Sequence, residues 1–197
     1  MKVPLRFQVT EFDCGTVSLL NAFNYLFERE EIPALLVKSI HKYTLDCYDE
    51  NGNLGNGGTS KEAIKKLTHW ITNYANNNDF DVICKRLEND EVNCENMTKC
   101  LNNNGVIFAR CFQTNEHYVI ITKIKGNKAY IFDPYYFDKS YYDKDRQVKI
   151  ILNKPFTHNR IVTLKRLFSE TRKDFSLGPI DSRECVLINR KWVNEYR

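Results

Sequence analysis

The chain has 197 residues, of which 42% are hydrophobic and 27% charged, and this size and balance predict a soluble globular domain with a buried core. Its 29 basic and 25 acidic residues leave a net charge of +4, which is too small and too evenly spread to indicate a nucleic-acid-binding protein. No stretch reaches the roughly 18 consecutive apolar residues of a membrane-spanning helix, and no signal peptide opens the sequence. We therefore expect a cytoplasmic protein without a membrane span, although a non-classical secretion route stays open.

The cysteines also favour a reducing compartment. They stand at positions 14, 47, 84, 94, 100, 111 and 185, an odd number that includes no C-x2-C pair. Because structural zinc sites usually contain such pairs, the sequence predicts free thiols and neither a metal nor another cofactor.

Helical periodicity dominates the first eighty residues. Apolar side chains recur at helical spacing through 14–29 and again through about 34–46. The Gly-rich segment 51–58 follows, rich in residues that tolerate positive φ, and we expect a mobile loop near the ligand cleft. This segment lacks the Gly-Lys-Ser/Thr ending of a phosphate-binding P-loop. A third helix is predicted at 61–76, capped by a hydroxyl side chain just before it.

From about residue 81 the pattern changes to short strands. They are predicted at 81–87, 106–112, 118–124, 128–133 and 184–189, with a short helix at 94–103. Helices followed by strands predict an α+β fold in a single domain spanning 1–197. In this fold a helical half of about 1–80 packs on an antiparallel sheet half of about 81–197, and the ligand cleft lies where the halves meet.

Cys14 stands between an Asp and a Gly at the expected start of the first, central helix. A helix N-terminus stabilises a thiolate and lowers the pKa of the thiol, and a nearby imidazolium does the same. This position marks Cys14 as a candidate nucleophile, whereas a lone cysteine is otherwise most often a small core residue. The side-chain amide of Gln8, together with the backbone N–H of Cys14, could stabilise an oxyanion on an attacked carbonyl.

His117 is the histidine that begins a predicted strand, and Asp133 ends the next strand. A carboxylate in that position can orient an imidazole base. Because side chains alternate along a strand, the pairing register decides whether the two share a face. A two-residue Gly126-Asn127 turn puts them on opposite faces, whereas a loop centred on Lys125 sets them directly opposite each other. The catalytic hypothesis therefore predicts a three- or five-residue connection, or a bulge, in place of the tight turn.

Three motifs stand together in this chain. They are Gln-x-x-x-x-Asp-Cys-Gly at 8–15, His-Tyr-Val-Ile-Ile at 117–121 and Ile-Phe-Asp-Pro at 131–134. The set resembles the double-glycine leader peptidases, which are papain-like cysteine peptidases usually found as N-terminal domains of bacteriocin-exporting transporters. The resemblance covers about 14–134 and implies a papain-like fold, with Cys14 as nucleophile, His117 as base, Asp133 as its orienting partner and Gln8 as the oxyanion-hole donor. Because no transmembrane segment or ATPase motif accompanies these motifs, the free-standing form is expected.

Tyr135 and Tyr136 follow Asp133-Pro134, and their rings could line the cleft and bind substrate, although an aromatic-rich surface hairpin would have the same sequence. We expect a cysteine hydrolase that forms a thioester acyl-enzyme with a peptide or protein substrate, and most simply a peptidase. A protein-glutamine deamidase or an acyl transferase on the same fold, and a catalytically silent binding module, are the alternatives. The sequence does not indicate an oligomeric state.

Overall fold

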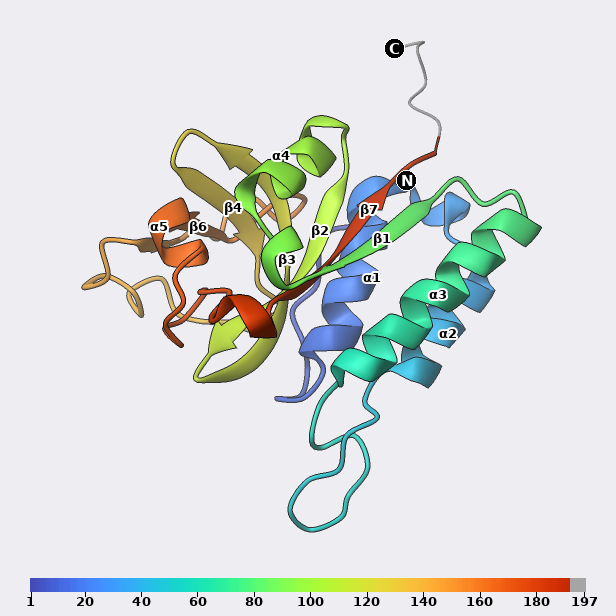
Figure 1. Cartoon of the computed structure of the whole chain (residues 1–197), viewed down its shortest axis with the longest axis horizontal. Coiled ribbons are helices and arrows are strands. Elements are labelled where there is room, and N and C mark those ends of the chain that lie inside the picture. The colour runs from blue at the N-terminus through green and yellow to red at the C-terminus, as the bar shows by residue number, and fades with distance from the viewer. Residues whose placement is uncertain (192–197) are drawn as a thin grey trace.

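Helices cover both faces of a seven-stranded antiparallel sheet in the computed structural model, which describes residues 1–191 (Figure 1). The helices are α1 (Cys14–Leu26), α2 (Ala34–Tyr43), α3 (Lys61–Asn77), α4 (Cys94–Asn102) and the single turn α5 (Leu164–Leu167). In spatial order the strands are β1 (Ile83–Glu88), β7 (Glu184–Asn189), β2 (Val106–Gln113), β3 (Asn115–Lys125), β4 (Lys128–Phe132), β6 (Arg160–Thr163) and β5 (Val148–Ile150). The α+β prediction is confirmed, and β5, β6 and α5 are elements that the sequence pattern does not predict.

Each face of the sheet has its own apolar core. On one face, side chains of α1, α2 and α3 pack on strand residues such as Phe108 and Ile120. On the other face, α4 and α5 pack on residues such as Val119 and Ile131. Successive residues of β3 therefore enter opposite cores, which explains why this strand is a nearly continuous apolar run.

The central helix α1 is fixed to both of its neighbours by buried polar side chains. Ser18 donates a hydrogen bond to the carbonyl oxygen of Tyr118 in β3 at 2.9 Å. Asn21 accepts from the N–H of Arg6 at 2.8 Å and donates to its carbonyl at 2.9 Å, which holds the N-terminal segment along the helix. Each bond contributes about 1 kcal/mol, and together they set where the N-terminus of α1 meets β3.

The β3–β4 hairpin corrects one sequence-based expectation and confirms its alternative. Lys125 pairs with Lys128 across the two-residue turn, so the longer connection is wrong. Gly126 takes a φ of 57°, which suits the first central position of a tight hairpin turn. A register shift between Ile121 and Lys123 nevertheless forms the expected bulge. The shift reverses the alternation beyond it and places His117 and Asp133 on one face.

Candidate active site

Cys14 is the first residue of α1, and its side chain is 8% exposed. The carboxylate of Asp13 accepts hydrogen bonds from the backbone N–H and the hydroxyl of Thr10, so it organises the loop before the helix and does not cap the helix itself. Gly15 allows a close approach on the other side, because a Cβ at that position would lie 2.7 Å from Oγ1 of Thr59. The base of the Gly-rich loop therefore packs directly against the start of α1.

The structure brings Cys14, His117 and Asp133 together. Nε2 of His117 lies 2.8 Å from Oδ1 of Asp133, and both side chains are buried. The ring of His117 also forms a hydrogen bond with the sulfur of Cys14. Because Nε2 donates to the carboxylate, Nδ1 is the ring nitrogen left to face the sulfur. The arrangement can hold a proton between a thiol and an oriented imidazole.

Electrostatics favours the ionised form of all three groups. Burial alone raises the pKa of the Cys14 thiol, but the hydrogen bond and charge of His117 outweigh it and bring that pKa below its ordinary value. Burial alone lowers the pKa of His117, but the charge and hydrogen bond of Asp133, aided by Cys14, raise it to about 10. Burial also raises the pKa of the Asp133 carboxyl, yet the charges of His117 and Arg160 hold it below its ordinary value. The geometry thus favours a thiolate–imidazolium pair.

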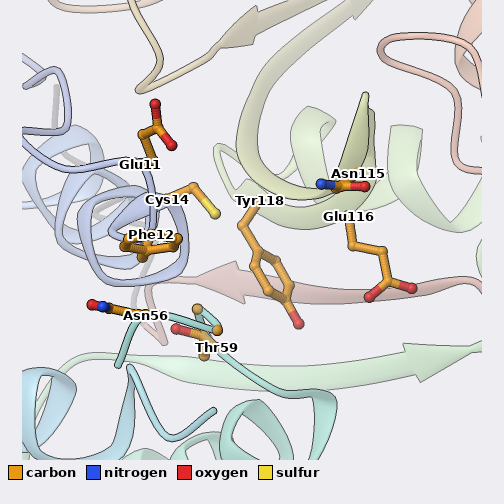
Figure 2. Close-up of a pocket in the computed structure, with 10 residues that line it drawn as sticks. Glu11, Phe12, Cys14, Asn56, Thr59, Asn115, Glu116 and Tyr118 are labelled. Carbon is orange, nitrogen blue, oxygen red and sulfur yellow. The ribbon is translucent and has the colours of Figure 1, made fainter. Parts of the chain in front are cut away.

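A pocket of about 350 Å³ opens beside the Cys14 sulfur, where the helical part of the chain meets the sheet (Figure 2). Its wall is formed by the loop before α1, by the base of the Gly-rich loop and by the start of β3. The lining residues are Glu11, Phe12, Cys14, Asn56, Gly57, Gly58, Thr59, Asn115, Glu116 and Tyr118. The expected cleft and the expected proximity of the Gly-rich loop are both confirmed by this wall.

The pocket continues into a second cavity of about 410 Å³. Both cavities include Gly57, Asn115 and Glu116 in their walls, and the second ends at Arg172, whose guanidinium lies 5.6 Å from the centre of the Phe112 ring. Because the two cavities share part of their walls, they form one groove between the Gly-rich loop and the tip of the β2–β3 hairpin.

Buried polar residues fix the pocket floor at Tyr118. Its hydroxyl donates to Oε1 of Glu184 at 2.7 Å, and its ring stacks on Phe108 with centroids 4.7 Å apart. Glu184 also accepts two hydrogen bonds from Arg86, at 3.0 and 2.7 Å. Sequence analysis does not single out this network, because the three polar residues lie on three different strands.

The other residues proposed for the site lie close to it. The backbone N–H of Gln8 donates to the carbonyl of Pro134 at 2.8 Å, which places Gln8 beside the end of β4. Its Nε2 donates to the carbonyl of Thr10 at 2.8 Å, so one of its two amide hydrogens is already engaged. Gln8 does not line the Cys14 pocket among the described residues, and its oxyanion role stays a prediction.

Tyr135 and Tyr136 face different surroundings. The ring of Tyr135 packs on Phe137 with centroids 5.0 Å apart, and its backbone N–H donates to Oδ1 of Asp133 at 2.8 Å. Tyr136 is 55% exposed and packs edge-on against Phe7. Within residues 1–191 the pocket wall contains neither tyrosine, so a substrate-binding role for them stays a prediction.

Asp133 is surrounded by donors that the sequence does not reveal. Nε2 of Gln113 donates to Oδ2 at 3.1 Å, and a guanidinium nitrogen of Arg160 lies 3.2 Å from the same oxygen. The side chain of Asn159 bonds both the N–H and the carbonyl of Asp133, at 2.8 and 2.7 Å. Arg160 is the first residue of β6 and Asn159 directly precedes it, and no local sequence pattern marks this polar pair as part of the site.

Residues 1–191 contain no group of three His, Cys, Asp or Glu side chains placed to hold a metal ion. In the same part of the chain, no helix has both the length and the apolar character to cross a bilayer.

Comparisons with known proteins find similarity at the level of structure. No protein-family model matches it, and neither does any curated protein. Among solved structures, the chain is similar to a double-glycine-motif protease from an AMS/PCAT transporter, solved in complex with the leader peptide. The similarity covers 96% of this chain and 92% of that one, with 14% sequence identity and a TM-score of 0.46. At this identity and TM-score the likeness does not by itself assign an activity or a substrate.

Proposed function

We propose that this chain is a papain-like cysteine hydrolase, most simply a peptidase, in which Cys14, His117 and Asp133 form the catalytic triad. The observation that carries the proposal is that His117 contacts both Asp133 and the sulfur of Cys14, and that Cys14 lines the wall of an open groove. A cysteine that served only packing would not need an oriented imidazolium beside it. The pKa directions of the three groups support the same assignment.

The mechanism begins with the thiolate. The Cys14 sulfur attacks the carbonyl carbon of an amide, a C–S bond forms, and the electron pair of the C=O double bond moves to the oxygen. The backbone N–H of Cys14, which the helix does not use, and the free amide hydrogen of Gln8 are proposed to stabilise this oxyanion. The imidazolium of His117 then gives its proton to the departing nitrogen as the C–N bond breaks, which leaves a thioester on Cys14.

Water completes the cycle. His117, now neutral and held by Asp133, takes a proton from water, the hydroxide oxygen attacks the thioester carbon, and the C–S bond breaks. The acid product leaves, and the proton on His117 restores the thiolate–imidazolium pair. A peptide or protein substrate is proposed to bind in the groove that the two cavities form beside Cys14.

A peptide library read by mass spectrometry tests the proposed reaction. Incubation with the wild-type chain is expected to give products cleaved in the main chain, and the Cys14→Ala variant is expected to give none. An uncleaved peptide in which one side-chain amide has become a carboxylic acid would identify a side-chain deamidase. Incorporation of an added amine would identify an acyl transferase. Binding without any product would favour a silent module.

Alkylation with iodoacetamide below pH 7 is expected to modify Cys14 ahead of the other thiols. Burial raises the pKa of the other thiols whose shift is resolved, namely Cys47, Cys84, Cys100, Cys111 and Cys185. The Cys14 thiol loses its proton at lower pH, so the rate at Cys14 should fall only when the pH drops below its lowered pKa. Peptide mapping by mass spectrometry gives the rate for each cysteine. Equal rates at all of them would contradict the proposal.

A further inference from the structure

Arg160 is a fully buried charge that the proposed mechanism does not use. It lies in β6, its side chain has no exposed surface, and it approaches the Asp133 oxygen that His117 leaves free. The two oxygens of Asp133 therefore face two different cations, with His117 at Oδ1 and Arg160 at Oδ2. A buried arginine is rare unless a partner compensates its charge.

Several contacts fix the guanidinium in this position. Nη2 donates to the carbonyl of Tyr135 at 2.8 Å, and Nη1 donates to the carbonyl of Asn159 at 3.0 Å. The group also lies 5.7 Å from the centre of the Phe137 ring. Its Nε is buried and has no hydrogen-bond partner. Burying the guanidinium charge and leaving its Nε–H group unpaired both cost free energy. The ion pair with Asp133 is the interaction that offsets this cost.

The buried charges around Asp133 balance. The two negative groups are the Cys14 thiolate and the Asp133 carboxylate. The two positive groups are the His117 imidazolium and the Arg160 guanidinium. Other titratable groups near Asp133 are the thiol of Cys111 on β2 and the hydroxyl of Tyr142, and burial raises the pKa of both, so they stay neutral. Asp174 accepts hydrogen bonds from the hydroxyl of Tyr142 at 2.8 Å and from the N–H of Thr114 at 3.2 Å.

We propose that Arg160 is a positioning residue of the Cys14 site, whose charge balances the buried cluster and so allows Cys14 to exist as a thiolate at neutral pH. This inference rests on the proposed function, because it assigns a residue that acts on the nucleophile through Asp133. Without Arg160 the cluster would carry one net negative charge in a buried environment. The cluster would then take up a proton, and because Asp133 keeps His117 protonated, the proton would go to Cys14.

The first test removes the charge of Arg160 and keeps polar donors. The alkylation rate of Cys14 falls toward acid pH as the thiolate takes up a proton, and this part of the pH profile is its acid limb. In Arg160→Gln the acid limb is expected to move up by about one pH unit, as the loss of one nearby charge predicts. Arg160→Lys keeps the charge in a different geometry, and its limb is expected to coincide with that of the wild type. Circular dichroism confirms that each variant is folded. A folded Arg160→Gln variant whose limb does not move would overturn the inference and leave Arg160 a purely structural residue.

A second pair of variants tests whether charge next to Asp133 sets the acid limb of Cys14, even if Arg160→Gln does not fold. Gln113 is only half-buried and donates to the same oxygen of Asp133. Gln113→Lys adds a positive charge there, so its limb is expected to move to lower pH, whereas Gln113→Met removes the hydrogen bond without a charge and serves as the matched control. An unchanged or raised limb in Gln113→Lys would refute the charge argument. Alkylation of wild-type Cys14 no faster than the other thiols would instead remove the proposed function itself.

Discussion

Replacement of Cys14 by alanine is expected to abolish turnover and to leave the fold intact. The variant lacks the nucleophile, and losing such a group lowers kcat by at least about a thousandfold even where binding and oxyanion stabilisation persist. Only one buried sulfur atom is removed, so the free energy of unfolding should change by no more than about 1 kcal/mol. Product formation on a substrate found in the peptide library measures the first effect, and chemical denaturation measures the second.

A second cysteine provides the control. Cys47 is half-buried just before the Gly-rich segment 51–58, and its thiol has a pKa raised by burial and by the charge of Asp46. Cys47→Ala is expected to retain turnover close to that of the wild type. Turnover retained by Cys14→Ala would refute the assignment of the nucleophile. Equal losses in both variants would show that the chemistry depends on the loop and not on the thiolate.

The long periodic elements could be predicted from the sequence because each of them buries one clear stripe or face. Helices α1 and α3 carry apolar residues at helical spacing, and their structures agree with the predicted 14–29 and 61–76 to within a few residues. Strands β2 and β3 are long apolar runs. For such segments, burial against a neighbour and local propensity favour the same structure.

The segment after Asp133 behaves differently. Strands β5 and β6 have only three and four residues. The first residue of β6, Arg160, is fully buried, although an apolar residue is expected at a buried strand position. Only the ion pair with Asp133, 27 positions earlier in the sequence, makes that burial tolerable. A short strand stabilised by a distant charge leaves no local signal, so neither the strand nor the role of Arg160 could be predicted.

Residue type and position alone select Cys14, His117 and Asp133 as candidates, and the structure brings the three side chains together. Their relative geometry could be predicted only in part. The bulge that aligns the last two lies at Thr122, a β-branched residue that suits a regular strand equally well. No turn rule could locate it, and only the requirement that the base and its partner share a face predicted a change of register.

The two partners of the nucleophile are expected to fail in different ways when they are changed. His117→Ala removes the group that lowers the pKa of Cys14 and the proton donor for the departing nitrogen, so turnover should fall by at least about a thousandfold. Asp133→Asn is expected to impair turnover less, since an amide can still orient an imidazole. The same turnover assay compares the two variants. Equal losses of turnover would show that the carboxylate does more than orient the ring.

The two variants are expected to rank in the opposite order for stability, with Asp133→Asn losing more free energy of unfolding than His117→Ala. Asp133 accepts hydrogen bonds from His117, Gln113 and the N–H of Tyr135 and pairs with Arg160, and all four partners are donors. An asparagine amide would turn its own N–H₂ group toward one of these donors and leave the buried guanidinium without its counter-charge, a loss of about 3 kcal/mol or more. His117→Ala removes a cation and leaves Arg160 to neutralise Asp133, so its loss should be smaller. Chemical denaturation of both variants checks this order, and an Asp133→Asn variant as stable as the wild type would mean that the buried ion pair contributes nothing to the fold.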